Sequence, residues 1–284
     1  MQEAEKVRAR QRLRPINSPQ NALLKELRRA FAQGECTADG YCAIESVRII
    51  EEAVRSGLRF RAVFFSESAA EKAERLLPQI SSHAEALLVP DAAFRATVAT
   101  ETPQGVAALV RTKEFTLEQV LAAPDALLVV VAGVQDPGNL GTILRSAEAF
   151  GASGVLLTEG TVSHLNSKAV RAAAGSVFRL PVLKVGAKEV AEHLRARGIR
   201  LLATSSHKGK PVDAVELTGA LALLIGSEGA GLPRALQAAA DEVIAIPHAA
   251  RVESLNAGIA ASVMLYEAAR QRRIKTAEAI EERD

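Results

Sequence analysis

Residues 126–132 have the sequence Ala-Leu-Leu-Val-Val-Val-Ala, a run without a polar side chain. Strands that are covered by helices on both faces of a parallel sheet have this composition. A second wholly apolar run lies at Leu221–Ile225. The two runs predict central strands of a mostly parallel sheet, and therefore an α/β fold for this half of the chain.

The segments around these runs alternate between strand and helix patterns. Further strands are predicted at 154–158, 182–184, 199–204 and 242–246, and helices at 140–150, 167–174, 188–197, 232–240 and 254–272. Strands that alternate with helices form βαβ units. Because ligands of such sheets bind beyond the carboxyl ends of the strands, the loops after the strands are the candidate site.

The N-terminal half predicts a smaller α/β domain. Strands are predicted at 41–44, 60–65, 86–89 and 105–110. Helices are predicted at 21–31, from the end of the first strand to about residue 55, and at 68–80. Ser68 is expected to cap the third helix, and Asp91 a further short one. Basic residues precede this domain, at Lys6, Arg8, Arg10, Arg12 and Arg14. We expect domains at 1–112, with a basic arm at 1–20, and at 126–284, joined by a linker at 113–125.

Composition excludes several classes of protein. Hydrophobic residues at 48% and charged residues at 24% are ordinary for a globular chain, which excludes disordered, collagen-like and disulfide-scaffold proteins. Aromatic residues at 4%, with no Trp, argue against RNA binding through a dense aromatic stacking platform. The net charge of +2 does not by itself imply a polyanionic partner.

Targeting and metal motifs are not found in the sequence either. The N-terminal residues lack the apolar core of a secretory signal, and no uninterrupted apolar run is long enough to span a bilayer. Cys36, Cys42 and the five histidines lack the spacing of a zinc site. We expect a cytoplasmic protein with reduced thiols, no metal and no membrane partner.

The first candidate loop, residues 134–142, follows the strand at 126–132 and leads into a helix. Its glycines permit the close approach of a ligand or of a neighbouring element. The helix N-terminus is a candidate anion site, and Arg145 carries the forked donors that clamp a phosphate or a ribose. The alternative is an ordinary strand–turn–helix with a surface arginine.

The second candidate loop, residues 226–233, has the sequence Gly-Ser-Glu-Gly-Ala-Gly-Leu-Pro. Its glycine spacing matches neither the dinucleotide-binding pattern nor the phosphate-binding P-loop. The glycines nevertheless indicate a backbone that bends sharply or lies against something flat. Glu228 is either a helix-start carboxylate or a functional group.

The third candidate loop, residues 246–256, precedes a helix that begins with small residues. Ser254 or Glu253 is expected to cap this helix. Gly258 and the alanines around it indicate either a tightly packed core helix or a self-association face. A hydrolase mechanism at Ser254 is disfavoured because the G-x-S-x-G elbow is absent.

Together these loops resemble the three ordered motifs of the SpoU (TrmH-like) RNA methyltransferases. The motifs are Asn139-x-Gly141-x-x-x-Arg145, then Leu224-Ile225-Gly226-Ser227-Glu228-Gly229-x-Gly231-Leu232, then Ile246-Pro247 followed by Glu253-Ser254-Leu255-Asn256. The resemblance covers residues 125–272. The N-terminal half is similar to the RNA substrate-binding domain that often precedes this catalytic domain, with Thr100-Glu101-Thr102-Pro103-Gln104-Gly105 at its exit. It departs from the family at Ile44-Glu45-Ser46, where Glu-Gly is usual.

The resemblance implies an α/β fold of the SPOUT type with a deep trefoil knot, a homodimer, and S-adenosylmethionine bound in the knot. It implies methyl transfer to a ribose 2′-hydroxyl of RNA, with ribosomal RNA expected ahead of transfer RNA. The positions that carry over for the cofactor are Gly226, Ile246, Leu255, Thr204 and Ser227. Those that carry over for catalysis and RNA contact are Asn139, Arg145, Glu228, Ser254 and Asn256.

The chemistry agrees with these residue types. The sulfonium methyl is already activated, so such an enzyme mainly aligns the hydroxyl oxygen with the methyl–sulfur axis. We expect Arg145 to orient the hydroxyl rather than to act as a base, because a guanidinium is almost always protonated. The alternatives are a SPOUT enzyme that methylates a base nitrogen, a catalytically silent RNA-binding protein and, more distantly, a nicotinamide-dependent dehydrogenase.

Overall fold

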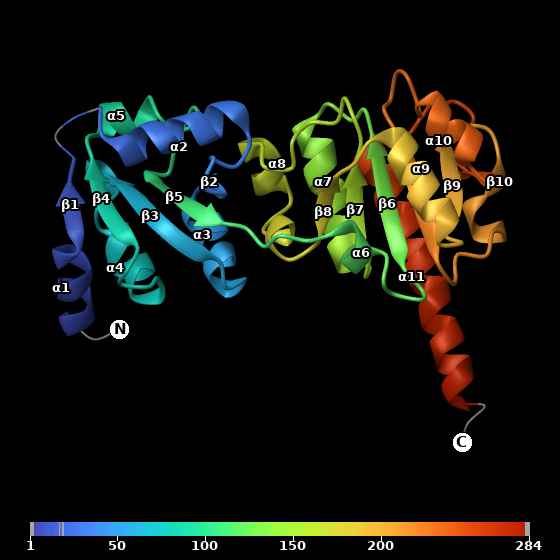
Figure 1. Cartoon of the computed structure of the whole chain (residues 1–284), viewed down its shortest axis with the longest axis horizontal. Coiled ribbons are helices and arrows are strands. Elements are labelled where there is room, and N and C mark those ends of the chain that lie inside the picture. Colours follow the sequence, from blue (N-terminus) through green and yellow to red (C-terminus); the bar gives the residue numbers. More distant parts are fainter. Residues whose placement is uncertain (1–2, 17, 19, 282–284) are drawn as a thin grey trace. The chain divides into compact units, whose positions relative to one another are not determined.

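The computed structural model describes residues 3–16, 18 and 20–281, and it divides into two compact units. Unit 1 consists of Met1–Lys113 and Ser163–Phe178, and unit 2 of Glu114–Val162 and Arg179–Asp284. Figure 1 draws both units, coloured along the chain. Parts of the predicted arm (residues 1, 2, 17 and 19) and the end of the predicted catalytic domain (residues 282–284) lie outside the described residues.

Unit 1 is built on a five-stranded mixed sheet with the order β1-β4-β3-β5-β2. The strands are β1 (Leu13–Pro15), β2 (Tyr41–Glu45), β3 (Arg59–Ser66), β4 (Glu85–Val89) and β5 (Val106–Arg111). β4 is parallel to β1 and β3, whereas β5 is antiparallel to β2 and β3. The short edge strand β1 was not predicted, because three residues carry no alternation pattern.

Helices cover both faces of this sheet. They are α1 (Glu3–Gln11), α2 (Ala22–Gln33), α3 (Val47–Arg55), α4 (Lys72–Leu76) and α5 (Asp91–Arg95). Leu24 and Leu27 of α2 and Phe94 of α5 pack with alternate strand residues in one core. Figure 1 shows α3 and α4 on the other side of the sheet.

The predicted helix at 68–80 is wrong as a continuous element. The chain forms a 3-10 turn at Glu67–Ala69, then α4, then a second 3-10 turn at Leu77–Gln79. Ser68 does not cap a helix, because its backbone N–H and its hydroxyl both donate to Asp91 Oδ1 (3.0 and 2.9 Å). Asp91 is accordingly the first residue of α5 and not its cap. Pro78 lacks a backbone N–H and disfavours helix at the residue before it, in agreement with the end of α4.

Two cations of the predicted basic arm are engaged inside unit 1. Arg10 forms an ion pair with Glu74. Arg12 donates from its guanidinium to the carbonyl oxygens of Leu77 and Ser81, at 2.8 Å each. These contacts fasten the start of the chain to α4 and to the turn that follows it.

Unit 1 also includes Ser163–Phe178, a segment that lies within the predicted catalytic domain by its sequence position. From its helix α8 (Ser167–Ala172), Arg171 donates to Glu45 Oε1 (2.5 Å) and to Thr100 Oγ1 (2.7 Å). Glu45 is only 6% exposed. Burial raises the pKa of its carboxyl, and Arg171 opposes that effect. The chain therefore passes between the two units three times.

Unit 2 contains a seven-stranded sheet in which all neighbours are parallel, in the order β10-β12-β9-β11-β6-β7-β8. The strands are β6 (Leu127–Ala132), β7 (Gly154–Leu157), β8 (Val182–Lys184), β9 (Arg200–Ser205), β10 (Lys210–Pro211), β11 (Leu221–Gly226) and β12 (Glu242–Ala245). The two apolar runs, β6 and β11, lie side by side near the centre. This arrangement confirms the predicted α/β fold with a mostly parallel sheet, and the trefoil knot stays a prediction.

The helices of unit 2 are α6 (Leu117–Val120), α7 (Pro137–Ala149), α9 (Ala187–Ala196), α10 (Arg234–Ala239) and α11 (Ala257–Glu281). The expectation that Ser254 or Glu253 caps the last helix is wrong. Asn256 caps α11 instead, because its Oδ1 accepts from the backbone N–H groups of Gly258 (3.0 Å) and Ile259 (3.2 Å). α11 therefore begins three residues later than predicted.

α7 and α11 pack closely within the same chain. A Cβ atom added to Gly258 would lie 3.1 Å from Cβ of Thr142, so this position has no room for a larger side chain. Further along, Ser146 Oγ lies 2.6 Å from Ser262 Oγ. The small residues at the start of α11 thus belong to the core of unit 2, the first of the two alternatives considered for them.

Candidate active site

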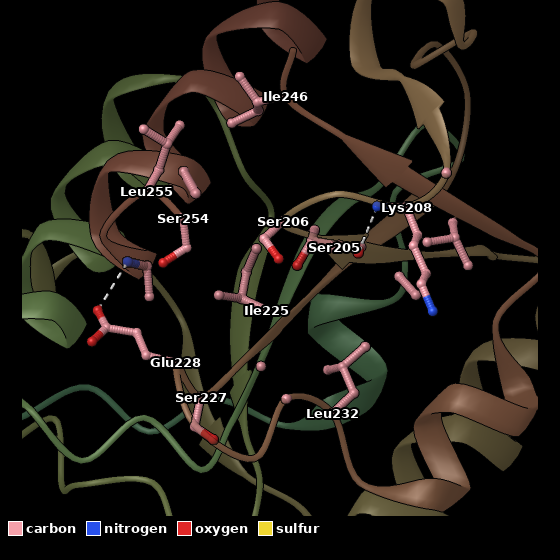
Figure 2. A pocket seen from close by; sticks show the side chains of 18 of the residues that line it. Ser205, Ser206, Lys208, Ile225, Ser227, Glu228, Leu232, Ile246, Ser254 and Leu255 are labelled. Atoms are coloured by element: carbon pink, nitrogen blue, oxygen red, sulfur yellow. Dashed lines mark hydrogen bonds between the residues drawn. The ribbon is translucent and has the colours of Figure 1, made fainter. Parts of the chain in front are cut away.

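A cavity of about 800 Å³ opens at the carboxyl ends of three neighbouring strands of unit 2, β12, β9 and β11. The loops that follow these strands form its walls together with the first turns of α11. Its volume lies within the range of small-molecule sites. Figure 2 shows side chains from all three loops around the cavity, with Glu228 and Lys208 toward opposite sides of the view.

The lining combines an apolar part with a polar part. The large apolar residues are Ile225, Leu232, Ile246, Leu255 and Met264, and the polar ones include Ser205, Ser206, Lys208, Glu228 and Ser254. The five residues predicted to bind the cofactor all line this cavity, namely Thr204, Gly226, Ser227, Ile246 and Leu255. They come together because β9, β11 and β12 are adjacent and parallel, so the loops at their carboxyl ends meet.

The loop after β11 folds back over Gly226. Ser227 N–H donates to the Gly231 carbonyl oxygen (3.2 Å), and Gly231 N–H donates to the Ser227 carbonyl oxygen (3.0 Å). A Cβ atom on Gly226 would lie 2.5 Å from the Gly231 carbonyl carbon and 2.7 Å from the Leu232 nitrogen. Glycine is required at 226 because the loop's own backbone occupies the space that a side chain would need.

Two of the lining hydroxyl groups are bonded within the protein. Thr204 Oγ1 donates to the Leu224 carbonyl oxygen (2.8 Å) and so ties β9 to β11. Ser227 Oγ accepts from Ala230 N–H (3.2 Å) and keeps its own proton for a further bond. In this arrangement a ligand can accept a hydrogen bond from Ser227 but not from Thr204.

Three predicted catalytic residues, one from each motif, form a hydrogen-bonded chain beside the cavity. Asn139 Nδ2 donates to Glu228 Oε1 (3.1 Å), and Asn256 Nδ2 donates to Asn139 Oδ1 (2.7 Å). The same Glu228 oxygen accepts from Ala257 N–H (3.3 Å) at the start of α11. A carboxylate is favourable there because the N-terminus of a helix carries partial positive charge.

The other two predicted catalytic residues lie apart from this chain of hydrogen bonds. Ser254 lines the cavity. Arg145 is exposed on α7, does not line the cavity, and makes no hydrogen bond or ion pair with any residue that the structure describes. Its guanidinium is therefore available to a partner that approaches from outside the chain.

Sequence reasoning missed the last residue of β9 and the loop that follows it. Ser205 Oγ accepts from Lys208 N–H (3.1 Å), which bends this loop at the edge of the cavity. His248 lines the cavity from the loop after β12, with Nδ1 2.7 Å from the Ile246 carbonyl oxygen and its ring centre 5.5 Å from that of His207. The rule that ligands bind beyond strand ends points to both loops, although no glycine pattern marks the first of them.

Among residues 3–16, 18 and 20–281, no group of three or more His, Cys, Asp or Glu residues is placed to hold a metal ion. None of the helices formed by these residues is both long enough and apolar enough to cross a membrane.

Both halves of the chain match known families. The SpoU rRNA Methylase family matches residues 126–266, and the MRM3-like substrate binding domain matches residues 21–108. RlmP of Bacillus subtilis (strain 168), a 23S rRNA (guanosine(2553)-2′-O)-methyltransferase, is 31% identical over 254 residues, which are 89% of this chain and 98% of that protein. The chain belongs to the SpoU rRNA methylase family.

Solved structures of SpoU methyltransferases share the fold. AviRb from Streptomyces viridochromogenes, solved in complex with AdoMet, has a TM-score of 0.78 and 30% identity, over 90% of this chain and 99% of that chain. A structure described as an RNA 2′-O ribose methyltransferase has a TM-score of 0.72 and 32% identity, over 91% of this chain and 99% of that one. These likenesses confirm the SpoU family and the RNA methyltransferase class that the three motifs predicted.

Proposed function

We propose that this SpoU-family protein transfers a methyl group from S-adenosylmethionine to a ribose 2′-hydroxyl of ribosomal RNA. One observation carries the proposal: the cavity at the ends of β9, β11 and β12 adjoins the hydrogen-bonded chain of Asn139, Glu228 and Asn256. A small-molecule pocket and a set of fixed polar groups beside it are what a methyl transfer between a bound donor and an incoming hydroxyl requires. The names of RlmP and of the 2′-O ribose methyltransferase support the ribose as acceptor.

The residues of the cavity fit S-adenosylmethionine. Ile246 and Leu255, with other apolar side chains, would hold the flat adenine ring, and the loop folded over Gly226 offers backbone groups to it. Ser205, Ser254 and Lys208 would suit the zwitterionic methionyl end. When bound, the cofactor supplies a methyl group that is already activated on a sulfonium sulfur.

The protein's own side chains would align the reacting groups. Glu228 and Asn256 hold the Asn139 amide from both sides and thereby fix its orientation. Arg145 would orient the ribose hydroxyl and its neighbouring phosphate with its forked donors. Such alignment of reacting groups is a large part of the rate that an enzyme provides for a bimolecular transfer.

We infer that the active form is a homodimer. Three large apolar side chains on α11 are exposed and follow helical spacing on one face, Ile259 (54%), Val263 (39%) and Tyr266 (49%). An exposed apolar stripe of this kind favours a protein contact. Arg145 lies outside the cavity of its own chain on α7, which packs on α11, so a second copy would bring a cavity to it. We also propose that the catalytic domain contains the deep trefoil knot and that the protein is cytoplasmic.

The decisive experiment measures tritiated methyl transfer from S-adenosylmethionine to 23S ribosomal RNA from a strain that lacks this protein. After the modified nucleotide has been mapped, the assay is repeated with RNA that carries 2′-deoxyribose at that nucleotide. We expect transfer to the ribose substrate and none to the deoxy substrate. Undiminished transfer to the deoxy RNA would assign a base nitrogen as acceptor, and calorimetry that detects no cofactor binding would favour a silent RNA-binding protein. Transfer to transfer RNA alone would correct the substrate class.

A further inference from the structure

The outer face of α2 in unit 1 carries three basic side chains, Lys25, Arg28 and Arg29. Their spacing of three and four residues places them on one face of the helix, and all three are exposed because the opposite face packs in the core. None of them forms an ion pair with another described residue. Arg28 makes one contact, a hydrogen bond of 3.4 Å to Thr97 Oγ1.

Like charges at this spacing repel one another and weaken a helix, so an uncompensated group of them needs a reason. Several basic residues on the other helices of unit 1 are paired, although Arg8 of α1 and Arg48 of α3 are exposed without an ion pair to another described residue. Ion pairs form there between Arg10 and Glu74, Arg55 and Glu52, and Arg75 and Glu51. α2 differs from these helices because three exposed basic side chains without an ion pair in the described part of the chain share one of its faces.

The basic surface continues from α2 to the ends of the neighbouring strands. Glu26 of α2 pairs with Arg61 at 2.8 Å. The guanidinium carbons of Arg61 and Arg111 lie 5.3 and 4.9 Å from the centre of the Tyr41 ring. Arg61 also pairs with Asp39 at 3.0 Å, so its charge is compensated, whereas Arg111 carries the positive charge beyond α2.

We propose that Lys25, Arg28 and Arg29 form the surface through which unit 1 contacts the phosphate groups of the RNA substrate. The inference rests on the proposed function. It names the part of the chain that binds the RNA at nucleotides other than the one that is methylated. Arginine and lysine donors suit phosphate oxygens, and contacts of this kind position an RNA without reading its sequence. We assign this role to α2 rather than to the N-terminal arm because α2 places three cations, unpaired among the described residues, on one face, whereas Arg10 and Arg12 of the arm already have partners within unit 1.

The test compares two full-length double variants that remove the same charge from unit 1. Lys25→Gln/Arg29→Gln alters the proposed surface, and Arg55→Gln/Arg75→Gln alters the α3/α4 layer. Filter binding of a radiolabelled 23S ribosomal RNA transcript is measured at several KCl concentrations. Each lost phosphate contact reduces the slope of log affinity against log salt by about 0.7–0.9. We expect the α2 variant to bind at least ten-fold more weakly at low salt with a slope reduced by about 1.4–1.8, and the control to stay within two-fold of the unaltered protein.

Thermal melting and calorimetric cofactor binding of each variant verify that unit 1 and the cavity are intact. Equal RNA affinity of the α2 variant and the unaltered protein would overturn the proposal, as would an equal loss in both variants. Retained RNA binding with lost affinity for phosphatidylserine vesicles would assign the surface to a membrane and also overturn it. If the unaltered protein binds no RNA, the proposed function itself fails, and this surface fails with it.

Discussion

Asn256 donates its side-chain amide to Asn139 Oδ1 across 2.7 Å and thereby joins the third sequence motif to the first. Its other side-chain atom, Oδ1, accepts from two backbone N–H groups and caps α11. One residue thus starts a helix with its oxygen and orients a neighbouring amide with its nitrogen. Because the two roles use different atoms, a single substitution can remove one and keep the other.

Asn256→Asp is expected to keep the cap and lose the donor. A carboxylate is as good a cap as an amide, so the melting temperature should not fall. Asn139 would then lie between two carboxylates and could satisfy only one of them, so we expect methyl transfer to fall by about 10²-fold. Asn256→Ala is the comparison: it should lose activity and also about 1 kcal/mol of unfolding free energy. A fully active Asn256→Asp would remove the hydrogen-bonded chain from the mechanism.

The loop after β11 offers a matched pair of glycine substitutions. Gly226→Ala places a Cβ atom against the Gly231 and Leu232 backbone and should open the loop. We expect the unfolding free energy to fall by about 1–3 kcal/mol and the cofactor to bind at least ten-fold more weakly. Gly229→Ala is the control, since a Cβ atom there meets nothing within 4 Å. Calorimetric titration and urea unfolding of both variants check the prediction. Similar cofactor affinities for the two would show that closure of this loop does not shape the cavity.

Gly258→Leu and Ile259→Asp are expected to act on different contacts of α11. The first forces a side chain against Thr142 of the same chain, so it should lower the unfolding free energy by about 1–3 kcal/mol. The second charges the exposed stripe and should convert a dimer to monomers without unfolding them. Ile274→Asp, at another exposed isoleucine of α11, is the control for the second. Sedimentation velocity that finds Ile259→Asp still dimeric would place the interface elsewhere.

Glu45 predicts a pH dependence of stability. Its pKa in the folded protein lies above the ordinary value of 4.5, mainly because the carboxyl is buried. The folded state therefore binds this proton more readily than the unfolded chain, so the stabilisation is fully present below pH 4.5 and is lost as the pH rises through the folded-state pKa. The Glu45→Gln variant has no titrating group at this position. Its unfolding free energy should therefore increase relative to that of the unaltered protein as the pH rises from 4 to 8. Parallel urea-unfolding curves of the two proteins across this range would contradict the prediction.

Six of the seven strands of unit 2 could be predicted, because apolar residues mark them in the sequence, whereas the short exposed strand β10 has no such pattern and was missed. The first residue of a helix was harder to predict, since it depends on which of several polar side chains caps the helix. Glu253, Ser254 and Asn256 stand close together, and only the packing of α11 against α7 selects Asn256. Ser68 was misjudged because its partner, Asp91, lies on another element. Such partners are tertiary facts that no local pattern contains.

The candidate site was partly visible in the sequence for a similar reason. Gly226 and its loop stand out because a backbone that folds back on itself needs glycine. Ser205, Ser206 and Lys208 line the same cavity but belong to an ordinary polar loop, and only the adjacency of β9 to β11 and β12 gives them a place there. The exposure of Arg145 away from the cavity could not be inferred from its position in the motif.

The bond between Arg171 and Glu45 has a consequence for biosynthesis. Domains of a nascent chain usually fold in order, the N-terminal one first. Here the first 113 residues leave the ribosome without the segment that completes their own unit, which ends at Phe178. Until that segment is translated, the Glu45 carboxylate lacks Arg171 as its partner and is either hydrated or protonated. The N-terminal unit reaches its final state only after the first two strands of the unit that follows it have been made.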